Sequence, residues 1–92
     1  MAYRRIHIFY SGRVQGVGFR YTAHSTASGL ELAGWAKNLK DGRVEVVCEG
    51  EEKKLKVFID NMAKEFPSYY ITDADIAWEE PTREFKGFDI RF

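Results

Sequence analysis

The amino-acid sequence predicts an α+β fold in which two helices pack on one face of an antiparallel sheet. Five segments alternate apolar and polar residues as strands do, two repeat apolar residues at helical spacing, and the order is β-α-β-β-α-β with a further C-terminal strand. Both helical stripes can be buried together when the helices cover the same face of the sheet. The 92 residues fit one domain, residues 1-92, and leave no room for a second.

The first strand is predicted over residues 4–11. Ile6, Ile8 and Tyr10 recur at a period of two in a segment rich in β-branched and aromatic side chains. Ile6 and Ile8 are therefore expected to face the core. His7 has the opposite parity and is expected to be a partly exposed strand residue, because no cluster of Cys, His or carboxylate residues has the spacing of metal ligands.

The first helix is predicted to start at Phe19. Phe19, Ala23, Ala27 and Leu30 follow one another at intervals of four, four and three residues, which places them on one helix face. Several serine and threonine residues in this segment are weak helix formers, so packing against the sheet has to stabilise the helix. Gly29 is one candidate for the C-terminal stop, and a left-handed conformation at residue 31 is the alternative.

Two antiparallel strands, residues 34–40 and 43–49, are predicted on either side of an Asp41-Gly42 turn. In the second of these strands Val44, Val46 and Cys48 share one face. Cys48 is interpreted as a small core residue, because no partner base for a nucleophilic thiol is evident.

The second helix is predicted over residues 51–66, with an apolar stripe on one side, charged residues on the other and Pro67 at its end. Residues 71–79 and 88–92 are the last two predicted strands, joined by a loop at residues 80–84. These elements fit a ferredoxin-like sandwich. The expected spatial strand order is 4-1-3-2, with the last strand beside strand 2.

Residues 11–20 contain three glycines in seven positions and end in an arginine, between a predicted strand and a predicted helix. Glycine lets backbone N–H groups converge on an anion, and Arg20 would stand at the first turn of the helix, where the helix dipole favours negative charge. The segment therefore predicts a phosphate site. It is not a P-loop, because the Gly-Lys-Ser/Thr ending is missing, and it is not a dinucleotide fingerprint, because the large Tyr21 stands where a small residue is needed.

Asn38 stands inside a predicted strand, where asparagine is disfavoured, and such a departure from a local rule often marks a functional position. Its carboxamide can both donate and accept hydrogen bonds, so it could orient a water without titrating. The alternative is an exposed residue at the end of the strand, leading into the turn.

Fourteen basic and fourteen acidic side chains give a formal net charge of zero. Binding to nucleic acid or to an anionic membrane depends on accumulated positive charge and is not expected. Cys48 is the only cysteine, the N-terminal residues lack the apolar core of a secretion signal, and no apolar run approaches the length of a membrane span. A cytoplasmic location is therefore expected.

Several separated motifs closely resemble the acylphosphatase family, and the resemblance covers essentially the whole chain. They are VQGVGFR at residues 14–20, LELAGWAKN at residues 30–38, DGRV at residues 41–44, EG at residues 49–50 and GFDIRF at residues 87–92. One departure is Glu31, which stands where the family usually has glycine. The resemblance also implies the ferredoxin-like fold.

The resemblance implies a hydrolase that converts acyl phosphates to carboxylate and inorganic phosphate, with Arg20 and Asn38 as catalytic residues. Arg20 and the loop would hold the phosphate, and Asn38 would position the attacking water. The expected phosphate-binding residues are Gln15, Gly16, Val17, Gly18, Phe19 and Arg20.

No cofactor and no metal are expected, and the partners are a small-molecule acyl phosphate and inorganic phosphate or sulfate as a competing ligand. A monomer is expected.

An RNA-binding module is one rival interpretation, but the strand at residues 43–49 has no aromatic residue on which bases could stack. A second rival is a module that holds a phosphorylated ligand without turnover. A third rival is a relative that is specific for carbamoyl phosphate, like the acylphosphatase-like domain of hydrogenase maturation proteins.

Overall fold

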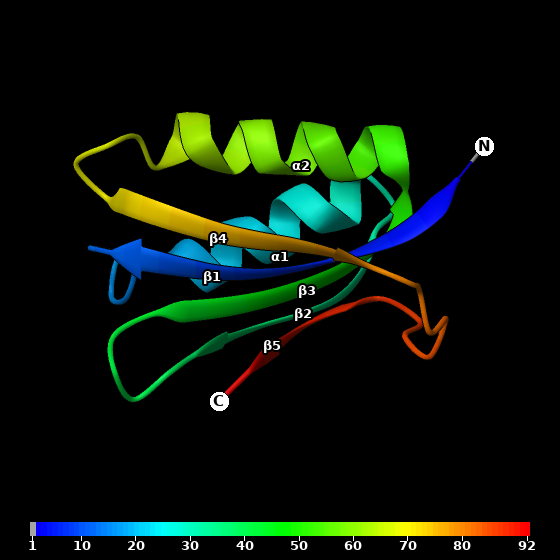
Figure 1. The fold of residues 1–92 in the computed structure, drawn as a ribbon. Helices are drawn as coiled ribbons and strands as arrows, with labels where there is room; N and C mark the ends of the chain where they lie inside the picture. Colours follow the sequence, from blue (N-terminus) through cyan, green and yellow to red (C-terminus); the bar gives the residue numbers. More distant parts are fainter. Residues whose placement is uncertain (1) are drawn as a thin grey trace.

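The computed structural model describes residues 2–92 and contains five strands and two helices (Figure 1). Their order confirms the β-α-β-β-α-β pattern with an additional C-terminal strand. The elements are β1 (Tyr3–Gly12), α1 (Phe19–Gly29), β2 (Ala33–Asn38), β3 (Val44–Glu51), α2 (Glu52–Glu65), β4 (Ile71–Glu79) and β5 (Phe88–Arg91). Neither helix combines the length and the apolar composition that crossing a bilayer requires.

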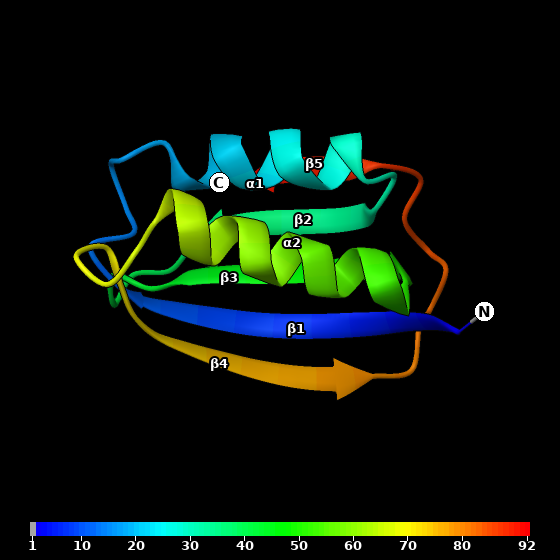
Figure 2. The same cartoon turned by 90° about the horizontal axis from the view of Figure 1, so that it is seen from above.

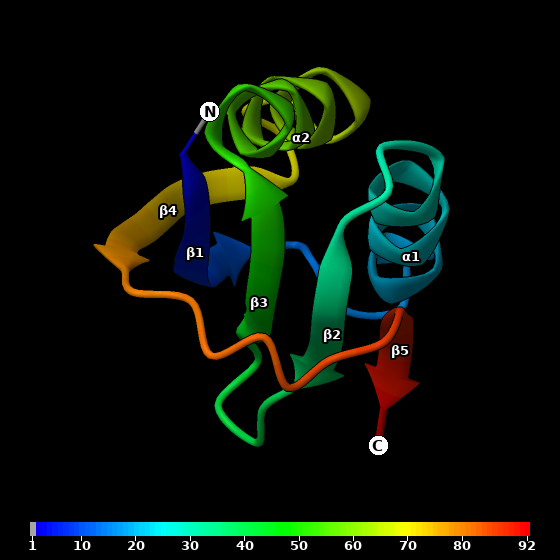
Figure 3. The same ribbon diagram turned by 90° about the vertical axis from the view of Figure 1, so that its right-hand side faces the viewer.

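The strands form one sheet in the order β4-β1-β3-β2-β5, which confirms the predicted order and the place of the last strand. Strands β1 to β4 pair antiparallel, as expected, but β5 runs parallel to β2, so the sheet is mixed. The connection at residues 80–87 crosses the sheet and enters β5 at the end where β2 starts (Figure 3). The Gly34 N–H donates to the carbonyl of Gly87 there, over 3.0 Å.

Both helices cover the same face of the sheet, which buries the two apolar stripes as the sequence predicts (Figure 2). The pairs Ile6–Cys48 and Ile8–Val46 of β1 and β3 lie at the centre of this face. All four side chains are fully buried. Burial raises the pKa of the Cys48 thiol, which agrees with its interpretation as a core residue.

Among the described residues, the buried carboxylate is Glu49, which lies on the helix-free face of the sheet and is only 1% exposed. It accepts hydrogen bonds from Arg5 Nη1 (3.1 Å), Thr82 N (2.8 Å), Thr82 Oγ1 (3.0 Å) and Arg83 N (2.8 Å). Burial alone would raise the pKa of Glu49, but the backbone donors at Thr82 and Arg83, together with Arg5, hold it below its usual value. Glu49 therefore fastens the connection at residues 80–87 to the middle of the sheet.

Helix α1 ends at Gly29, but this glycine does not adopt the left-handed conformation that closes the helix. Gly29 is the last helical residue and is not in the left-handed region, whereas Glu31 has a φ of 59°. The Leu32 N–H donates to the Ala27 carbonyl (2.9 Å) and the Glu31 N–H to the Ser28 carbonyl (3.1 Å), which is the bond pattern of a Schellman C-cap. Gly29 stands two residues too early for this role, so Glu31 adopts a conformation that costs a non-glycine residue about 1–2 kcal/mol.

The first prediction concerns this backbone strain. Glu31→Gly is expected to raise the midpoint of urea unfolding by roughly 1 M, because glycine adopts positive φ without strain. Glu31→Gln is the control: it removes the exposed ion pair with Lys54 (2.9 Å) and keeps the strain, so its midpoint should change little. An unchanged midpoint in Glu31→Gly would show that residue 31 stores no strain.

The second prediction concerns Glu49. Glu49→Gln should cost on the order of 3 kcal/mol of unfolding free energy at pH 7, because buried donors lose their charged acceptor. Since the folded-state pKa lies below the unfolded value, this contribution is fully present above about pH 4.3 and is lost as the pH falls through the folded pKa. The difference between variant and wild type, measured by urea unfolding at pH 7 and pH 3, should therefore shrink in acid.

Glu79→Gln provides the matched control, because Glu79 also pairs with Arg5 (3.0 Å) but its side chain is 41% exposed. It should cost less than about 1 kcal/mol. Equal losses in the two variants would contradict a special role for the buried carboxylate.

Candidate active site

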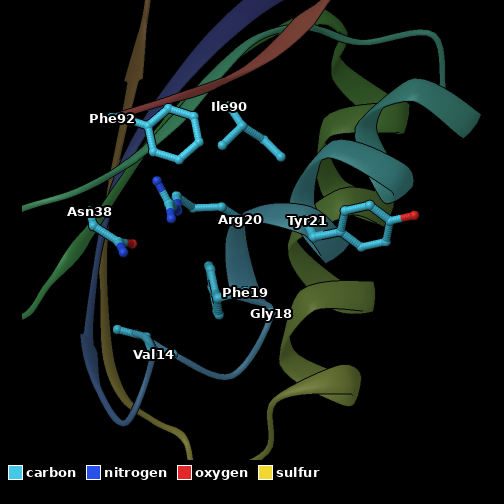
Figure 4. A pocket seen from close by; sticks show the side chains of 9 residues that line it. Val14, Gly18, Phe19, Arg20, Tyr21, Asn38, Ile90 and Phe92 are labelled. Atoms are coloured by element: carbon cyan, nitrogen blue, oxygen red, sulfur yellow. The ribbon is translucent and has the colours of Figure 1, made fainter.

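A pocket opens where the loop after β1, the start of α1 and the far ends of β2 and β5 meet (Figure 4). Its volume of 220 Å³ is below the range of about 300–1,000 Å³ typical of sites for drug-sized ligands, so it suits a small ligand. The lining residues are Val14, Gly16, Gly18, Phe19, Arg20, Tyr21, Asn38, Ile90 and Phe92.

The loop before α1 turns at two glycines in the left-handed region, Gly16 with a φ of 77° and Gly18 with a φ of 78°. A Cβ added at either position would meet no atom within 4 Å, so the backbone conformation, and not space, is what favours glycine there. Turns of this kind expose neighbouring N–H groups on one concave side, where an anion can bind.

Helix α1 begins directly at the pocket, and its first turn has free backbone donors. Its first bond within the helix runs from the Thr22 N–H to the Gly18 carbonyl (2.9 Å), so the N–H groups of Phe19, Arg20 and Tyr21 have no partner in the helix. Gly18 provides no side-chain cap, and the first turn contains no acidic residue. The positive end of the helix dipole therefore faces the pocket without a carboxylate of the helix to compensate it.

Arg20 is the only charged residue among the described residues that line the pocket. Its Nη1 donates to the carbonyl of Arg91 (2.8 Å), and its Cζ lies 4.7 Å from the centre of the Phe92 ring. Both contacts orient the guanidinium and leave its charge uncompensated. Because a guanidinium has five N–H donors, the others can still bind a second anionic group.

Asn38 is the last residue of β2 and pairs with Val44 of β3. It lies on the same face of the sheet as Ala36, which is the face that the helices cover. Figure 4 shows the carboxamide pointing into the pocket, toward the side chain of Arg20. Tertiary structure thus brings together the arginine and the asparagine that sequence analysis selected separately.

The side chain of Gln15 is used within the protein. Its Nε2 donates to the carbonyls of Leu39 (2.7 Å) and Arg43 (3.0 Å), which ties the loop to the turn that follows Asn38. Gly16, Gly18, Phe19 and Arg20 line the pocket as the predicted loop residues, whereas Gln15 and Val17 are not among the lining residues.

Four lining residues were not selected from the sequence: Val14, Tyr21, Ile90 and Phe92. Ile90 and Phe92 were interpreted as parts of a strand and of the GFDIRF motif, with no role in the site. No local pattern could have revealed their role, because β5 reaches the site through its pairing with β2, more than 50 residues away along the chain.

Within residues 2–92 no three His, Cys, Asp or Glu side chains converge as metal ligands would. His7 lies on the helix-free face, partly exposed as predicted, with its Nε2 2.6 Å from Glu45 Oε2.

The family model described as Acylphosphatase matches residues 6–90. A curated acylphosphatase of Roseiflexus sp. (strain RS-1) is 45% identical over 87 residues, which covers 94% of this chain and 92% of the relative. Among solved structures, the acylphosphatase from Bacillus subtilis superposes with a TM-score of 0.89 at 37% identity and covers 97% of this chain and 99% of its own.

A second solved structure, full-length HypF in its phosphate- and nucleotide-bound form, also has a TM-score of 0.89, at 32% identity. It covers 99% of this chain, but this chain corresponds to only 12% of the HypF chain. The family match and the relatives that align over nearly their whole length agree with the fold and with the motifs in the sequence. The chain therefore belongs to the acylphosphatase family.

Proposed function

We propose that this chain hydrolyses the carboxyl-phosphate anhydride of acyl phosphates, with Arg20 and the loop binding the phosphate and Asn38 orienting the attacking water. A hydrolase acting on acyl phosphates is what membership of the family indicates. The observation that carries the proposal is the convergence of Arg20, Asn38 and an uncapped helix N-terminus on one pocket that no acidic side chain of the described residues lines.

The phosphate would bind where positive charge and free donors coincide. The backbone N–H groups of residues 15–19 and the first turn of α1 can each donate to a phosphoryl oxygen, and Arg20 adds charge-assisted bonds of roughly 1.5–3 kcal/mol each. Arg91 and Phe92 hold the guanidinium before the substrate arrives, so little side-chain entropy is lost on binding.

Asn38 would hold a water on one side of the phosphorus. The oxygen of this water forms the new bond to phosphorus, while the bond between phosphorus and the acyl oxygen breaks and its electron pair leaves with the carboxylate. The water's protons pass to phosphate and solvent. The attacking and leaving oxygens lie roughly in line across the phosphorus, as in phosphoryl transfer generally.

For this reaction the protein needs only to position the phosphate and the water and to stabilise the charge on the phosphoryl oxygens. A mixed anhydride is already activated and its leaving group is a stabilised carboxylate, so the proposed mechanism has no covalent nucleophile. Donors held in place before the reaction can stabilise the phosphoryl oxygens as charge redistributes, with no cost of reorganisation.

The function is tested with benzoyl phosphate, whose disappearance is followed spectroscopically in the presence of a chelator. Hydrolysis that continues in chelator and that inorganic phosphate inhibits competitively is expected. p-Nitrophenyl phosphate, an ester with a poorer leaving group, should react far more slowly.

Two results would overturn the proposal. Binding of phosphate without turnover of benzoyl phosphate or carbamoyl phosphate would favour a carrier module, and activity that requires added magnesium would contradict the metal-free mechanism. A clear preference for carbamoyl phosphate would favour the rival relative named above.

The third prediction concerns Arg20. Arg20→Ala should weaken inhibition by phosphate and also lower kcat, because the guanidinium contacts the phosphate before and during the reaction. Arg20→Lys should recover little, since an ammonium cannot reproduce the planar grip on two oxygens. Steady-state kinetics at several phosphate concentrations measure both effects, and full recovery in Arg20→Lys would show that charge alone suffices.

The fourth prediction separates Asn38 from Arg20 by role. Asn38→Ala should lower kcat by a factor on the order of 10²–10³, the usual loss for a removed catalytic polar group, while the inhibition constant of phosphate stays nearly unchanged. An equal loss of phosphate binding would instead make Asn38 a substrate ligand or a structural support, and turnover near that of the wild type would remove it from the mechanism.

A further inference from the structure

We infer that the side chain of Gln15 is a positioning residue for the reaction: it fixes the phosphate-binding loop against the end of β2, so that a water held by Asn38 lies on the line of attack. The inference rests on the proposed function and deepens it, because it assigns a task to a residue that is not among those lining the pocket. In the proposed complex the Gln15 side chain touches neither the phosphate nor the water and acts through Asn38.

Pairing within the sheet does not fix the loop against Asn38. The loop, residues 13–18, follows β1, whereas Asn38 is the last residue of β2, and β3 lies between these two strands. Figure 4 shows Val14 and Asn38 on the same side of the Arg20 side chain, so the two segments meet at the pocket although their strands are not neighbours. Their separation therefore depends on contacts other than strand pairing.

Two hydrogen bonds of the Gln15 carboxamide provide such a contact. Its Nε2 donates to the carbonyl of Leu39 (2.7 Å) and to the carbonyl of Arg43 (3.0 Å). Within residues 2–92 no other hydrogen bond joins residues 13–18 to residues 38–43. The Gln15 side chain is half-buried, which partly shields both bonds from competing water. This one side chain therefore provides the hydrogen-bonded link between the loop and the end of β2.

Both acceptors belong to the hydrogen-bonded part of the turn between β2 and β3. The Leu39 N–H donates to the Arg43 carbonyl (2.8 Å), and the Gly42 N–H donates to the Leu39 carbonyl (3.2 Å). Each carbonyl has two lone pairs, so it can accept the Gln15 donor as well. Because Leu39 directly follows Asn38, a shift of the Asn38 backbone relative to the loop would stretch the bonds to Gln15.

A carboxamide suits this task because its nitrogen carries two donors and no charge. One donor is available for each of the two carbonyls. A glutamate of the same shape would set acceptor against acceptor, and a lysine would add a positive charge close to the phosphate site. The glutamine thus links the two segments without changing the charge that binds the phosphate.

The link separates an effect on turnover from an effect on binding. In the proposed complex the phosphate contacts the loop and Arg20, and Arg20 is oriented from β5 through the carbonyl of Arg91 (2.8 Å). The water contacts Asn38, at the other end of the link. In-line attack needs the reacting atoms about 3–3.5 Å apart, and a misplacement of about 1 Å can cost roughly 10²-fold in rate. Loss of the link should therefore lower kcat far more than the affinity for phosphate.

The test measures kcat for benzoyl phosphate and the inhibition constant of inorganic phosphate in Gln15→Met, whose side chain has a similar length but no donor. We expect kcat to fall by about 10- to 100-fold, while the inhibition constant stays within about threefold. Gln15→Asn keeps the carboxamide on a stem shorter by one methylene, so it should show the same split and replaces the methionine variant if that variant folds poorly. Urea unfolding of each variant monitors the fold.

A double-mutant cycle with Asn38→Ala tests whether Gln15 acts through Asn38. In the Asn38→Ala background, Gln15→Met should change kcat by less than about twofold, because no held water is left to position. If Gln15 only supported the fold, the two losses would multiply.

Asp41→Ala is the matched control, because it removes a hydrogen bond within the same turn, from the Arg43 N–H to Asp41 Oδ1 (3.1 Å), and leaves the two Gln15 bonds in place. Its kcat should stay within about twofold of the wild-type value. A loss as large as that in Gln15→Met would show that any loosening of the turn is sufficient and would overturn the inference.

Three further results would overturn the inference while hydrolysis by the wild type still supported the proposed function. They are a wild-type kcat in both Gln15 variants, an inhibition constant that rises as much as kcat falls, and losses that multiply in the cycle with Asn38→Ala. Absence of hydrolysis in the wild type would overturn the proposed function and the role of Gln15 with it.

Discussion

The double pairing of β2, antiparallel to β3 and parallel to β5, is the constraint on which the site depends. It puts the end of β2, with Asn38, beside the end of β5, whose carbonyl at Arg91 receives the Arg20 guanidinium. Burial of two apolar helix stripes on one sheet face fixes α1 above these strand ends (Figure 2). Residues from three distant segments therefore meet at one pocket.

Within the pocket, most of the free donors belong to the backbone, and Arg20 is the only charged side chain among the described lining residues. The left-handed turns at Gly16 and Gly18 lead into a helix start with unpaired N–H groups, and Arg20 follows in the first turn. Gln15 secures this loop to the turn after Asn38 through two backbone carbonyls. In the proposed function, donors fixed in this way need no rearrangement when the phosphoryl group changes its charge.

The buried carboxylate Glu49 and the strained residue Glu31 both lie away from the candidate active site. Glu49 binds the connection at residues 80–87 to the sheet on the helix-free face and so supports β5 from the side opposite to the pocket. Glu31 carries left-handed strain at the far end of α1, where the Schellman bonds and the burial of Leu32 compensate it. Helix propensity contributes little to α1, because its polar sequence depends on the contact of Phe19, Ala23 and Ala27 with the sheet.

The sequence by itself determined the elements and the acylphosphatase motifs, because each is recorded in local spacing: a period of two in the strands, a stripe in the helices, and glycines before Arg20. The strand order followed from the ferredoxin-like fold that the order of the elements predicts. Asn38 could also be selected from the sequence, as a residue that breaks a local preference. Only the tertiary structure decided that β5 runs parallel to β2, that Glu31 and not Gly29 adopts the left-handed conformation after α1, and that Tyr21, Ile90 and Phe92 line the pocket. These features depend on contacts between segments far apart in the chain, and hydrophobic periodicity does not encode the direction of a strand or the neighbour that it meets.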